Sequence, residues 1–384
     1  MTGLLMVAVE ASGDLHGAAV LRELRALRPD LRAFGAGGPK MRAEGLEALV
    51  RAEDLSVMGI AEVLPALPRL LEAMDTLRDA ARDRKPAAAL LIDSPDFNLR
   101  LAKQLRRLQV PVAYFIGPSV WAWRSYRVKQ IARDVARMLV ILPFEAAFYA
   151  RHGVVARYVG NPLADDLHAL PAAGLDPRAA ARCAIFGSDA GSLPVLALLP
   201  GSRLQEIHRL WPRMLAAARA LQGKIPGLRL VVPIAATLDR ALFGYAPDVQ
   251  FVDSAPQALA AADAAIVASG TATLEAALAG TPQVVVYRTS WLSWLVGRML
   301  IRVRFISLPN LLAGRALVTE LLQSDCTPER IALAIAPLLS DTPARNAQIE
   351  GLRAVREELA PPGSAGAARR AAEEVAALLG SASA

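Results

Sequence analysis

The chain of 384 residues is longer than a typical single domain, so its length favours two domains. Hydrophobic residues make up 54% and charged residues 21%, a composition that excludes intrinsic disorder. The formal net charge of +7 points to an anionic partner. Because the basic residues are spread along the chain and no zinc-finger or RNP motif is present, nucleic acid is disfavoured relative to phosphorylated small molecules or an anionic lipid surface.

The two cysteines and four histidines lack the spacing of a disulfide framework or a structural zinc site, which indicates a reducing cytosol. The first apolar run, Leu4 to Val9, is too short for a signal peptide. No run approaches the roughly 20 apolar residues of a membrane span. The sequence therefore predicts a soluble or peripheral protein in the cytoplasm.

The first elements have the pattern of an α/β unit. Leu4 to Val9 predicts a buried strand, the turn 10–17 follows, and a helix continues through Leu27. Residues 33–38 predict a second strand with a glycine-rich loop. The turn at 10–17 is placed where ligands of α/β folds bind, but it lacks the G-x-G-x-x-G pattern, so no dinucleotide site is predicted.

Apolar residues recur at helical spacing between Leu55 and Met74. The stripe contains Ile60, Val63, Leu64, Leu67, Leu70 and Leu71. Two interpretations remain open. The stripe is the core-facing side of a helix, or it is an exposed patch that enters a membrane surface or holds an acyl chain.

Ala87 to Ile92 predicts a buried strand, followed by a polar turn and a helix to about Arg107. Asp93 stands at the carboxyl end of this strand, where partial desolvation raises a carboxyl pKa and suits general-base chemistry. Asp96 follows a proline and is the better candidate for a structural role as an N-cap.

Two tryptophans, Trp121 and Trp123, lie in a loop after the strand predicted at 110–116. They either line a cleft for a sugar or acyl group or pack between domains. The segment from Leu170 to Pro177 is rich in proline, alanine and glycine and predicts an interdomain linker.

The second half repeats the alternation of strands and helices. Strands are predicted at 195–199, 228–232, 249–252, 264–268 and 283–287. Together the halves predict two doubly wound α/β domains that face each other across a cleft. We expect residues 1–168 and 169–345 to form these domains, and helices in 346–384 to pack back on the first.

Three polar turns in the second half predict one nucleotide-diphosphate site. Ser269-Gly270-Thr271 and Gly201-Ser202-Arg203 each join a strand to a helix, where free N–H groups and the helix dipole favour anions. The third is the loop 307–315. Each turn alone is more typical of an ordinary helix N-cap, and only the three together favour the nucleotide site. Arg203 is expected to reach a phosphate and Glu275 the ribose hydroxyls, although Glu275 also fits a solvated helix face.

The segment after Tyr287 is basic and aromatic. It contains Trp291, Trp294, Arg298 and Arg302. This pattern is typical of a helix at a polar–apolar interface, and equally of an arginine-rich solvated face.

Eight strings taken in order resemble the lipid-A-disaccharide synthase family over nearly the whole chain. They are Glu10-Ala-Ser-Gly-Asp14, Val57-Met-Gly-Ile60, Ile92-Asp-Ser-Pro-Asp-Phe-Asn98, Pro118-Ser-Val-Trp-Ala-Trp-Arg124, Leu142-Pro-Phe-Glu145, Leu199-Pro-Gly-Ser-Arg203, Ala268-Ser-Gly-Thr271 and Ser307-Leu-Pro-Asn-Leu-Leu-Ala-Gly-Arg315.

The resemblance implies an inverting GT-B glycosyltransferase that joins UDP-2,3-diacylglucosamine to 2,3-diacylglucosamine 1-phosphate (lipid X) and releases UDP. It makes Asp93 the base and borders the acceptor cleft with Ser12, Gly13 and Asp14. It assigns the UDP site to Arg203, Ser269, Gly270, Thr271, Glu275 and Asn310. Asp96, Asn98, Trp121, Trp123 and Arg315 complete the predicted substrate-binding residues.

The same resemblance places the protein on the inner face of the inner membrane, with the 55–74 stripe and the Trp291 segment facing the membrane. No cofactor is expected, and no metal, because the chain contains no Asp-x-Asp pair. A homodimer is left open. The alternatives are another UDP-sugar enzyme, such as a peptidoglycan glycosyltransferase or a UDP-sugar epimerase, and a non-catalytic module that binds anionic lipid.

Overall fold

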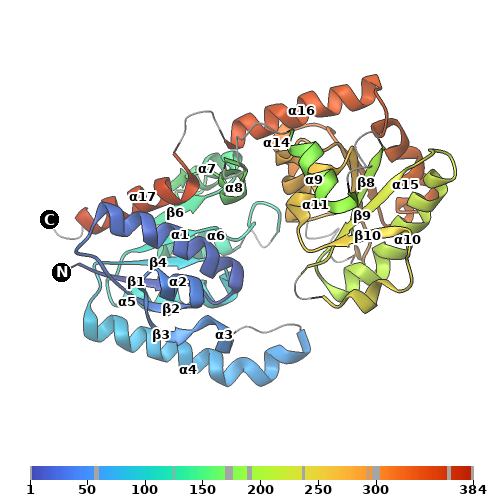
Figure 1. Ribbon diagram of the computed structural model, residues 1–384. Coiled ribbons are helices and arrows are strands. Elements are labelled where there is room, and N and C mark those ends of the chain that lie inside the picture. Colours follow the sequence, from blue (N-terminus) through green and yellow to red (C-terminus); the bar gives the residue numbers. More distant parts are fainter. Residues whose placement is uncertain are drawn as a thin grey trace. The chain divides into compact units, whose positions relative to one another are not determined.

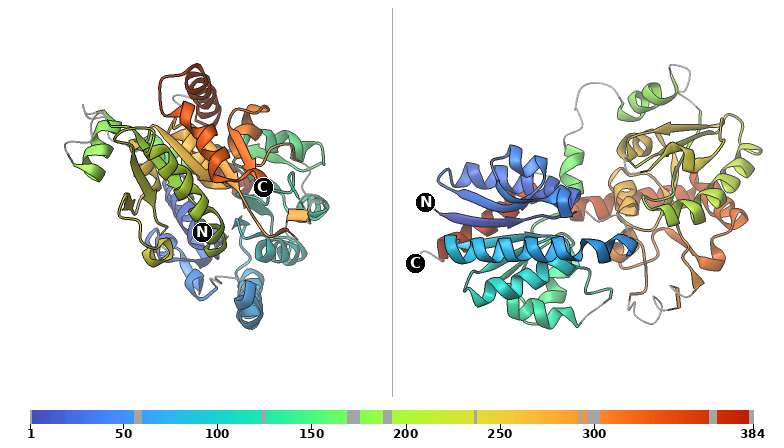
Figure 2. Two further views of the ribbon diagram at one scale, coloured as in Figure 1. Left: turned by 90° about the vertical axis from the view of Figure 1, so that its right-hand side faces the viewer. Right: turned by 90° about the horizontal axis from the view of Figure 1, so that it is seen from below.

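The computed structural model describes residues 2–55, 60–123, 126–168, 176–187, 193–235, 238–291, 294–295, 303–360 and 365–381, with the backbone alone at 60–66 and 166–168. These residues divide into two compact units. Unit 1 comprises Met1–Asp165 and Gly363–Ala384, and unit 2 comprises Asp166–Pro362. Each unit is an α/β sandwich with helices on both faces of one parallel sheet (Figures 1 and 2).

The described strands of unit 1 form one parallel sheet in the order β3-β2-β1-β4-β5-β6-β7. The strands are β1 (Gly3–Val7), β2 (Arg32–Gly37), β3 (Glu47–Arg51), β4 (Ala88–Ile92), β5 (Val112–Phe115), β6 (Arg137–Val140) and β7 (Ala156–Tyr158). The order reverses between β1 and β4. The carboxyl ends of these two strands therefore flank the position where open α/β sheets bind ligands.

Two apolar layers cover the sheet of unit 1. On one face, strand side chains pack against α4 (Ile60–Arg84), α5 (Pro95–Arg107) and α6 (Arg127–Asp134). On the other face, the alternate strand side chains pack against α1 (Ala11–Leu27), α2 (Pro39–Ala43) and α17 (Ala367–Ser381). Shorter helices are α3 (Ala52–Leu55), α7 (Pro143–Ala150) and α8 (Pro162–His168). Because both faces are covered, β4 is buried along its whole length, as its apolar sequence predicts.

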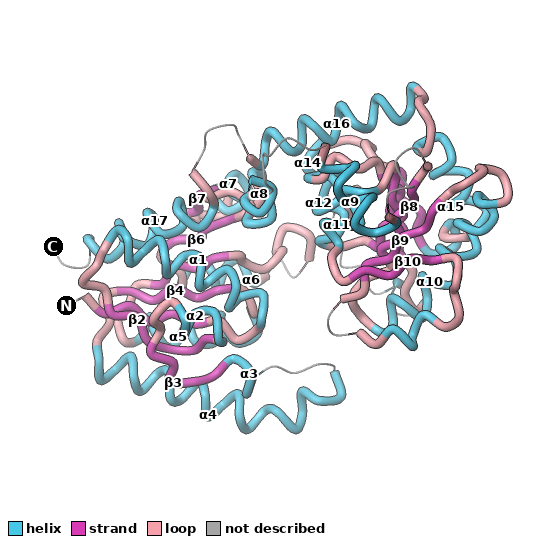
Figure 3. Tube along the Cα trace, in the orientation of Figure 1, coloured by secondary structure: helices cyan, strands magenta, loops and turns pink. Residues whose placement is uncertain are grey.

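The described strands of unit 2 form a second parallel sheet in the order β10-β9-β8-β11-β12-β13. The strands are β8 (Val195–Leu199), β9 (Arg229–Pro233), β10 (Val249–Val252), β11 (Ala264–Ala268), β12 (Gln283–Tyr287) and β13 (Thr319–Leu322). Here the order reverses between β8 and β11. Figure 3 shows the strands of each unit lying between helices.

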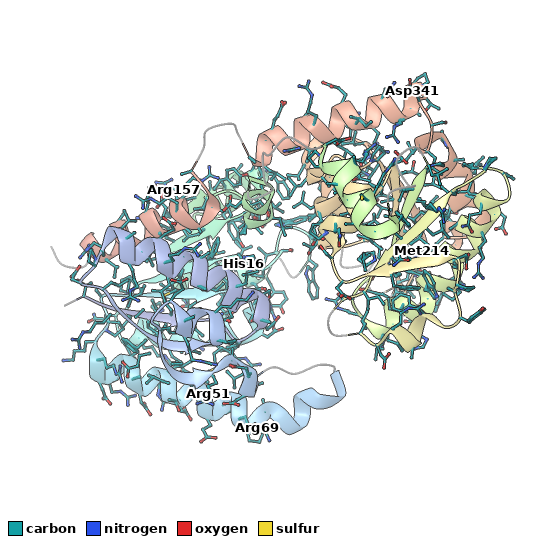
Figure 4. The ribbon with its side chains drawn as sticks, viewed as in Figure 1. His16, Arg51, Arg69, Arg157, Met214 and Asp341 are labelled. Atoms are coloured by element: carbon teal, nitrogen blue, oxygen red, sulfur yellow. The ribbon has the colours of Figure 1, made fainter. Side chains whose placement is uncertain are left out.

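Helices of unit 2 pack on both faces of this sheet. They are α9 (Pro177–Phe186), α10 (Leu204–Gln222), α11 (Ala255–Ala261), α12 (Thr271–Leu278), α14 (Leu308–Ala313), α15 (Pro328–Ile335) and α16 (Pro343–Leu359), with 3-10 turns η2 (Arg240–Phe243), η3 (Gln323–Asp325) and η4 (Ala336–Leu338). Met214, labelled in Figure 4, belongs to the buried side of α10.

The C-terminal helices belong to different units. Helix α16 contacts α12 and α14 of unit 2, whereas α17 contacts α1, β4 and β5 of unit 1. The division therefore falls between α16 and α17 and not at the expected residue 346, because α16 buries its apolar side on unit 2.

Candidate active site

A cavity of about 380 Å³ lies at the carboxyl edge of the sheet in unit 2, where the strand order reverses. Its volume falls within the roughly 300–1,000 Å³ of small-molecule sites. The lining residues are Leu199–Arg203, Glu206, Pro233–Ala235, Asp253, Ala255, Ala268–Ala272 and Glu275. Two of the three turns predicted from the sequence therefore meet in one pocket.

The amino-terminal end of α12 faces this pocket without a side-chain cap. Its N-cap is Gly270, which has φ +150° and is exposed, as is Thr271 at the first helical position. The neighbouring Ser269 hydroxyl donates to the Ile306 carbonyl oxygen at 3.3 Å, which ties the turn to the segment before α14. An uncapped helix end presents N–H dipoles to an anion.

The amino-terminal end of α10 differs, because a carboxylate of the protein already occupies it. Glu206 Oε2 accepts hydrogen bonds from the main-chain N–H groups of Ser202 (3.1 Å) and Arg203 (3.3 Å). Gly201 has φ +106°, and a Cβ there would come within 2.2 Å of the same oxygen. This corrects the expectation that both helix ends offer free N–H groups.

The guanidinium of Arg203 remains available to a ligand. Its side chain is 83% exposed, and Nη1 donates to Glu206 Oε1 at 3.3 Å. A pair this exposed contributes little to stability, since solvent screens it. The prediction that Arg203 reaches a phosphate is compatible with this geometry.

Two further carboxylates, besides Glu206, line the pocket. Glu275 lies one turn into α12, as the sequence predicted. Asp253 directly follows β10 and was not singled out from the sequence. Its position after a predicted strand was the available signal, because the carboxyl ends of parallel strands share one edge.

The third predicted turn supports the pocket and is not among its lining residues. The expected loop contains helix α14. Asn310 is 1% exposed, and its amide donates to the Val318 carbonyl and to Glu320 Oε1 while Oδ1 accepts from Leu317 N and Val318 N.

These bonds use both donors and both lone pairs of the Asn310 amide and hold α14 against β13. A contact of Asn310 with UDP stays a prediction. Arg315 is exposed, with its guanidinium near Gly351 of α16, and is likewise absent from the pocket lining.

At the carboxyl edge of unit 1, Asp93 follows β4 in a strained turn. Asp93 has φ +52° and Ser94 has φ +43°, a left-handed conformation that costs free energy in residues with a Cβ. The Asp93 carbonyl accepts from Tyr114 Oη (2.6 Å) and Asn98 Nδ2 (2.8 Å), and Nδ2 also donates to the Ile92 carbonyl. Asn98 is fully buried, so it supports the turn and does not line a surface.

The side chain of Asp93 lies in a partly desolvated position. Burial raises the pKa of this carboxyl above its ordinary value, and the charge of Glu10 adds to the shift. Asp96 is exposed and pairs with Arg127. The N-cap of α5 is Ser94, so Asp96 is a first-turn residue and not the expected N-cap.

The turn at 10–17 opens helix α1. Ser12 is exposed, whereas Gly13 is buried. A Cβ at Gly13 would contact Ala8 and the Ile92 carbonyl oxygen. The carboxylate of Asp14 accepts main-chain hydrogen bonds from Gly38, Lys40 and Met41 at 2.8–3.0 Å.

Asp14 therefore fixes the loop between β2 and α2, a structural role that the sequence did not reveal. For Ser12 and Gly13, the border with an acceptor stays a prediction.

The tryptophan loop follows β5, the neighbour of β4. Trp121 is half-buried and its Nε1 donates to Glu145 Oε1 at 3.0 Å, while Trp123 is 43% exposed. Trp121 thus packs inside unit 1, and Trp123 is the tryptophan of this loop that a substrate could contact.

Helix α4 divides the predicted stripe. Met74 is buried in the core, whereas Leu67 and Leu71 are 40% and 48% exposed and Leu70 packs partly against the core. The side chains of Val63 and Leu64 lie outside the described residues. Figure 4 labels Arg69 on the same helix, whose amino-terminal turns extend past the sheet of unit 1.

In the Trp291 segment, Trp291 is 74% exposed and Trp294 is half-buried, while Arg298 and Arg302 lie outside the described residues. Among the helices that the structure describes, none combines the length and apolar character needed to cross a bilayer.

Solved structures place this architecture in the GT-B class. A calicheamicin glycosyltransferase, CalG4, superimposes with a TM-score of 0.60 at 19% identity, covering 99% of this chain and 98% of that one. A Neisseria meningitidis UDP-GlcNAc 2-epimerase bound to UDP-GlcNAc gives 0.66 at 12% identity, covering 99% and 100%. At these identities the likeness shows the fold alone.

Sequence comparison resolves the family. The family model for lipid-A-disaccharide synthetase matches residues 4–375. A lipid-A-disaccharide synthase of Anaeromyxobacter sp. (strain K) is 52% identical over 379 residues, 97% of this chain and 96% of the relative. That of Myxococcus xanthus is 49% identical over 384 residues, covering 98% and 97%. The chain belongs to the lipid-A-disaccharide synthase family, whose members are glycosyltransferases of lipid A biosynthesis.

Proposed function

We propose that the protein transfers diacylglucosamine from UDP-2,3-diacylglucosamine to the 6-hydroxyl of lipid X, forming a β-1′,6-linked disaccharide and UDP. Family membership supports the reaction. The main observation that supports a UDP site in unit 2 is the uncapped amino-terminal end of α12 in the pocket.

In this proposal the diphosphate lies against the N–H groups after Gly270, with the guanidinium of Arg203 on its other side. Helix dipole and guanidinium stabilise the negative charge that develops on the leaving UDP. Ser269 and Thr271 border the same anion. Glu275, one turn further along α12, accepts hydrogen bonds from the ribose hydroxyls.

Asp93 is the proposed general base. Inversion at the sugar carbon requires the acceptor hydroxyl to lose its proton as it attacks. A carboxylate with a raised pKa holds that proton more strongly than an ordinary aspartate does. The bonds from Tyr114 and Asn98 to its main chain fix the direction of the side chain.

Both substrates carry acyl chains, so we propose that unit 1 contacts the cytoplasmic face of the inner membrane. The exposed Leu67 and Leu71 on α4 support this, together with the exposed Arg69 beside them. Apolar side chains flanked by a cation favour an anionic lipid interface.

The test is to mix the purified protein with UDP-2,3-diacylglucosamine and lipid X and to follow UDP release and disaccharide formation. We expect both products in equal amounts. Turnover of UDP-N-acetylglucosamine without an acylated acceptor would instead support the epimerase alternative. Absence of any turnover, with lipid binding retained, would support a non-catalytic membrane module.

A further inference from the structure

Glu145 is an acidic side chain in the interior of unit 1. It stands in the first turn of α7 and is 4% exposed. Its Oε1 accepts from Trp121 Nε1 at 3.0 Å, and its Oε2 accepts from the main-chain N–H groups of Leu142 (3.0 Å) and Ile141 (3.3 Å). One carboxylate thereby joins the start of α7 to the tryptophan loop.

Two further contacts connect α7 to the same loop. The ring of Phe144 meets Trp121 edge to face, with centroids 4.9 Å apart. The hydroxyl of Tyr149 donates to the Pro118 carbonyl at 3.4 Å. The Leu142–Glu145 string, whose sequence did not reveal a role for its residues, therefore supports the loop 118–121.

Burying this carboxylate is costly. Desolvation raises the pKa of Glu145 to about 7, against an ordinary value of 4.5, despite three N–H donors that favour the charged form. Replacing buried charged groups by apolar residues of similar size often leaves stability unchanged or raises it. The carboxylate favours one arrangement of the tryptophan loop and the start of α7, because the indole and both main-chain N–H groups must reach its two oxygens at the same time.

The supported loop leaves the sheet beside the proposed base. The Asp93 N–H donates to the Phe115 carbonyl at 3.0 Å, so the loop begins on the strand that binds the Asp93 turn. Trp123, two residues after Trp121, presents its ring to solvent. An indole has an apolar face and a polar edge, which suits an acylated sugar.

We propose that Glu145 is a positioning residue for the acceptor: through Trp121 it holds the loop so that the Trp123 ring contacts the acylated sugar. This inference rests on the proposed function, which supplies the acceptor.

The first variants are Glu145→Gln and Trp121→Phe. Glutamine has one acceptor oxygen and cannot serve both ends, whereas phenylalanine removes the indole donor and part of the ring but keeps an aromatic side chain. For each, above pH 7, where the Glu145 carboxyl is ionised, we expect the KM for lipid X to rise about 10- to 100-fold, the scale of a hydrogen bond to a charged group. UDP affinity should stay unchanged. The double variant should be no worse than the more affected single variant, because both remove the same bond.

A merely structural role predicts a different result. Both variants would then lower the melting temperature and leave the KM for lipid X within about twofold of wild type. That outcome, or fully additive losses in the double variant, would overturn the proposal. If Glu145→Gln fails to fold, Trp121→Phe alone decides between the two results.

Indole N–H resonances of 15N-labelled protein provide a readout independent of turnover. We expect Glu145→Gln to shift the Trp121 resonance and to broaden that of Trp123, and lipid X to shift the Trp123 resonance in the wild-type protein only. An unmoved Trp121 resonance contradicts the proposal. If the spectra agree but no UDP is released by wild-type protein, the proposed function fails instead.

Discussion

At the carboxyl edge of the sheet in unit 2, the pocket is bordered by an uncapped helix end and an exposed guanidinium. The same edge in unit 1 carries two carboxyl groups whose pKa values are raised by burial. Asp93 is half-buried, and Glu145 is almost completely buried. Similar sheets with the same kind of strand reversal therefore present different chemical groups at this edge. The difference teaches that one edge is suited to hold an anion, and the other to accept a proton.

The largest effect should follow from Asp93→Asn. We expect kcat to fall by about 10²- to 10⁴-fold, the range for a general base, because the amide cannot accept the proton. The measurement is steady-state turnover, with a melting curve as folding control. Asp96→Asn is the matched control and should lose far less activity, since Asp96 is exposed and paired with Arg127. A folded, inactive Asp96→Asn beside an active Asp93→Asn would exchange the two assignments.

A second prediction concerns stability and pH. In the folded protein Glu145 keeps its proton up to about pH 7, whereas its ordinary pKa is 4.5. Its contribution to stability is thus complete below about pH 4.5 and is lost as the pH rises through 7. Relative to Glu145→Gln, the wild-type free energy of unfolding should fall by up to about 3 kcal/mol over this window. The measurement is denaturant unfolding of both proteins at several pH values. A difference in free energy of unfolding that stays constant with pH would contradict the raised pKa.

For unit 2, Arg203→Ala should weaken UDP binding by roughly 1.5–3 kcal/mol, the value of a hydrogen bond between charged groups. Stability should hardly change, because the Arg203–Glu206 pair is exposed. Isothermal titration with UDP provides the measurement, and unchanged affinity would remove Arg203 from the site.

The smallest effect concerns α4. Leu67→Ser with Leu71→Ser should weaken binding to vesicles of anionic phospholipid by roughly 1 kcal/mol per leucine, because about half of each side chain is already covered. The melting temperature should stay close to that of wild type. Leu77→Ser is the matched control on the same helix: Leu77 is fully buried, so this variant should be destabilised by roughly 2–5 kcal/mol. Unfolding of the Leu67/Leu71 variant would show that the stripe is core.

The sequence predicted the buried strands well. Strands β8, β10, β11 and β12 begin and end at the predicted residues. Strands β8 and β11 are buried apolar runs between polar turns, whereas β10 is only partly buried at the sheet edge. Strand β3 was missed, since its residues are half-buried or exposed at the sheet edge and its apolar run is limited to Ala48-Leu49-Val50. Strands β6 and β13 were missed as well.

The site was predicted where its chemistry is local. The Gly-Ser-Arg and Ser-Gly-Thr turns line the pocket because each strand and its following helix are consecutive in the chain. The structural role of Asn310 was not predicted, because its partners at 317, 318 and 320 meet it only after β13 joins the sheet. The role of Glu145 was likewise hidden, since Trp121 lies 24 residues away.

Titration of UDP against wild type, Asp93→Asn and Arg203→Ala under one set of conditions tests the contrast between the two edges most directly. The account predicts that Asp93→Asn binds UDP as tightly as wild type while Arg203→Ala binds it at least about tenfold more weakly. Loss of UDP affinity in Asp93→Asn together with wild-type affinity in Arg203→Ala would contradict it.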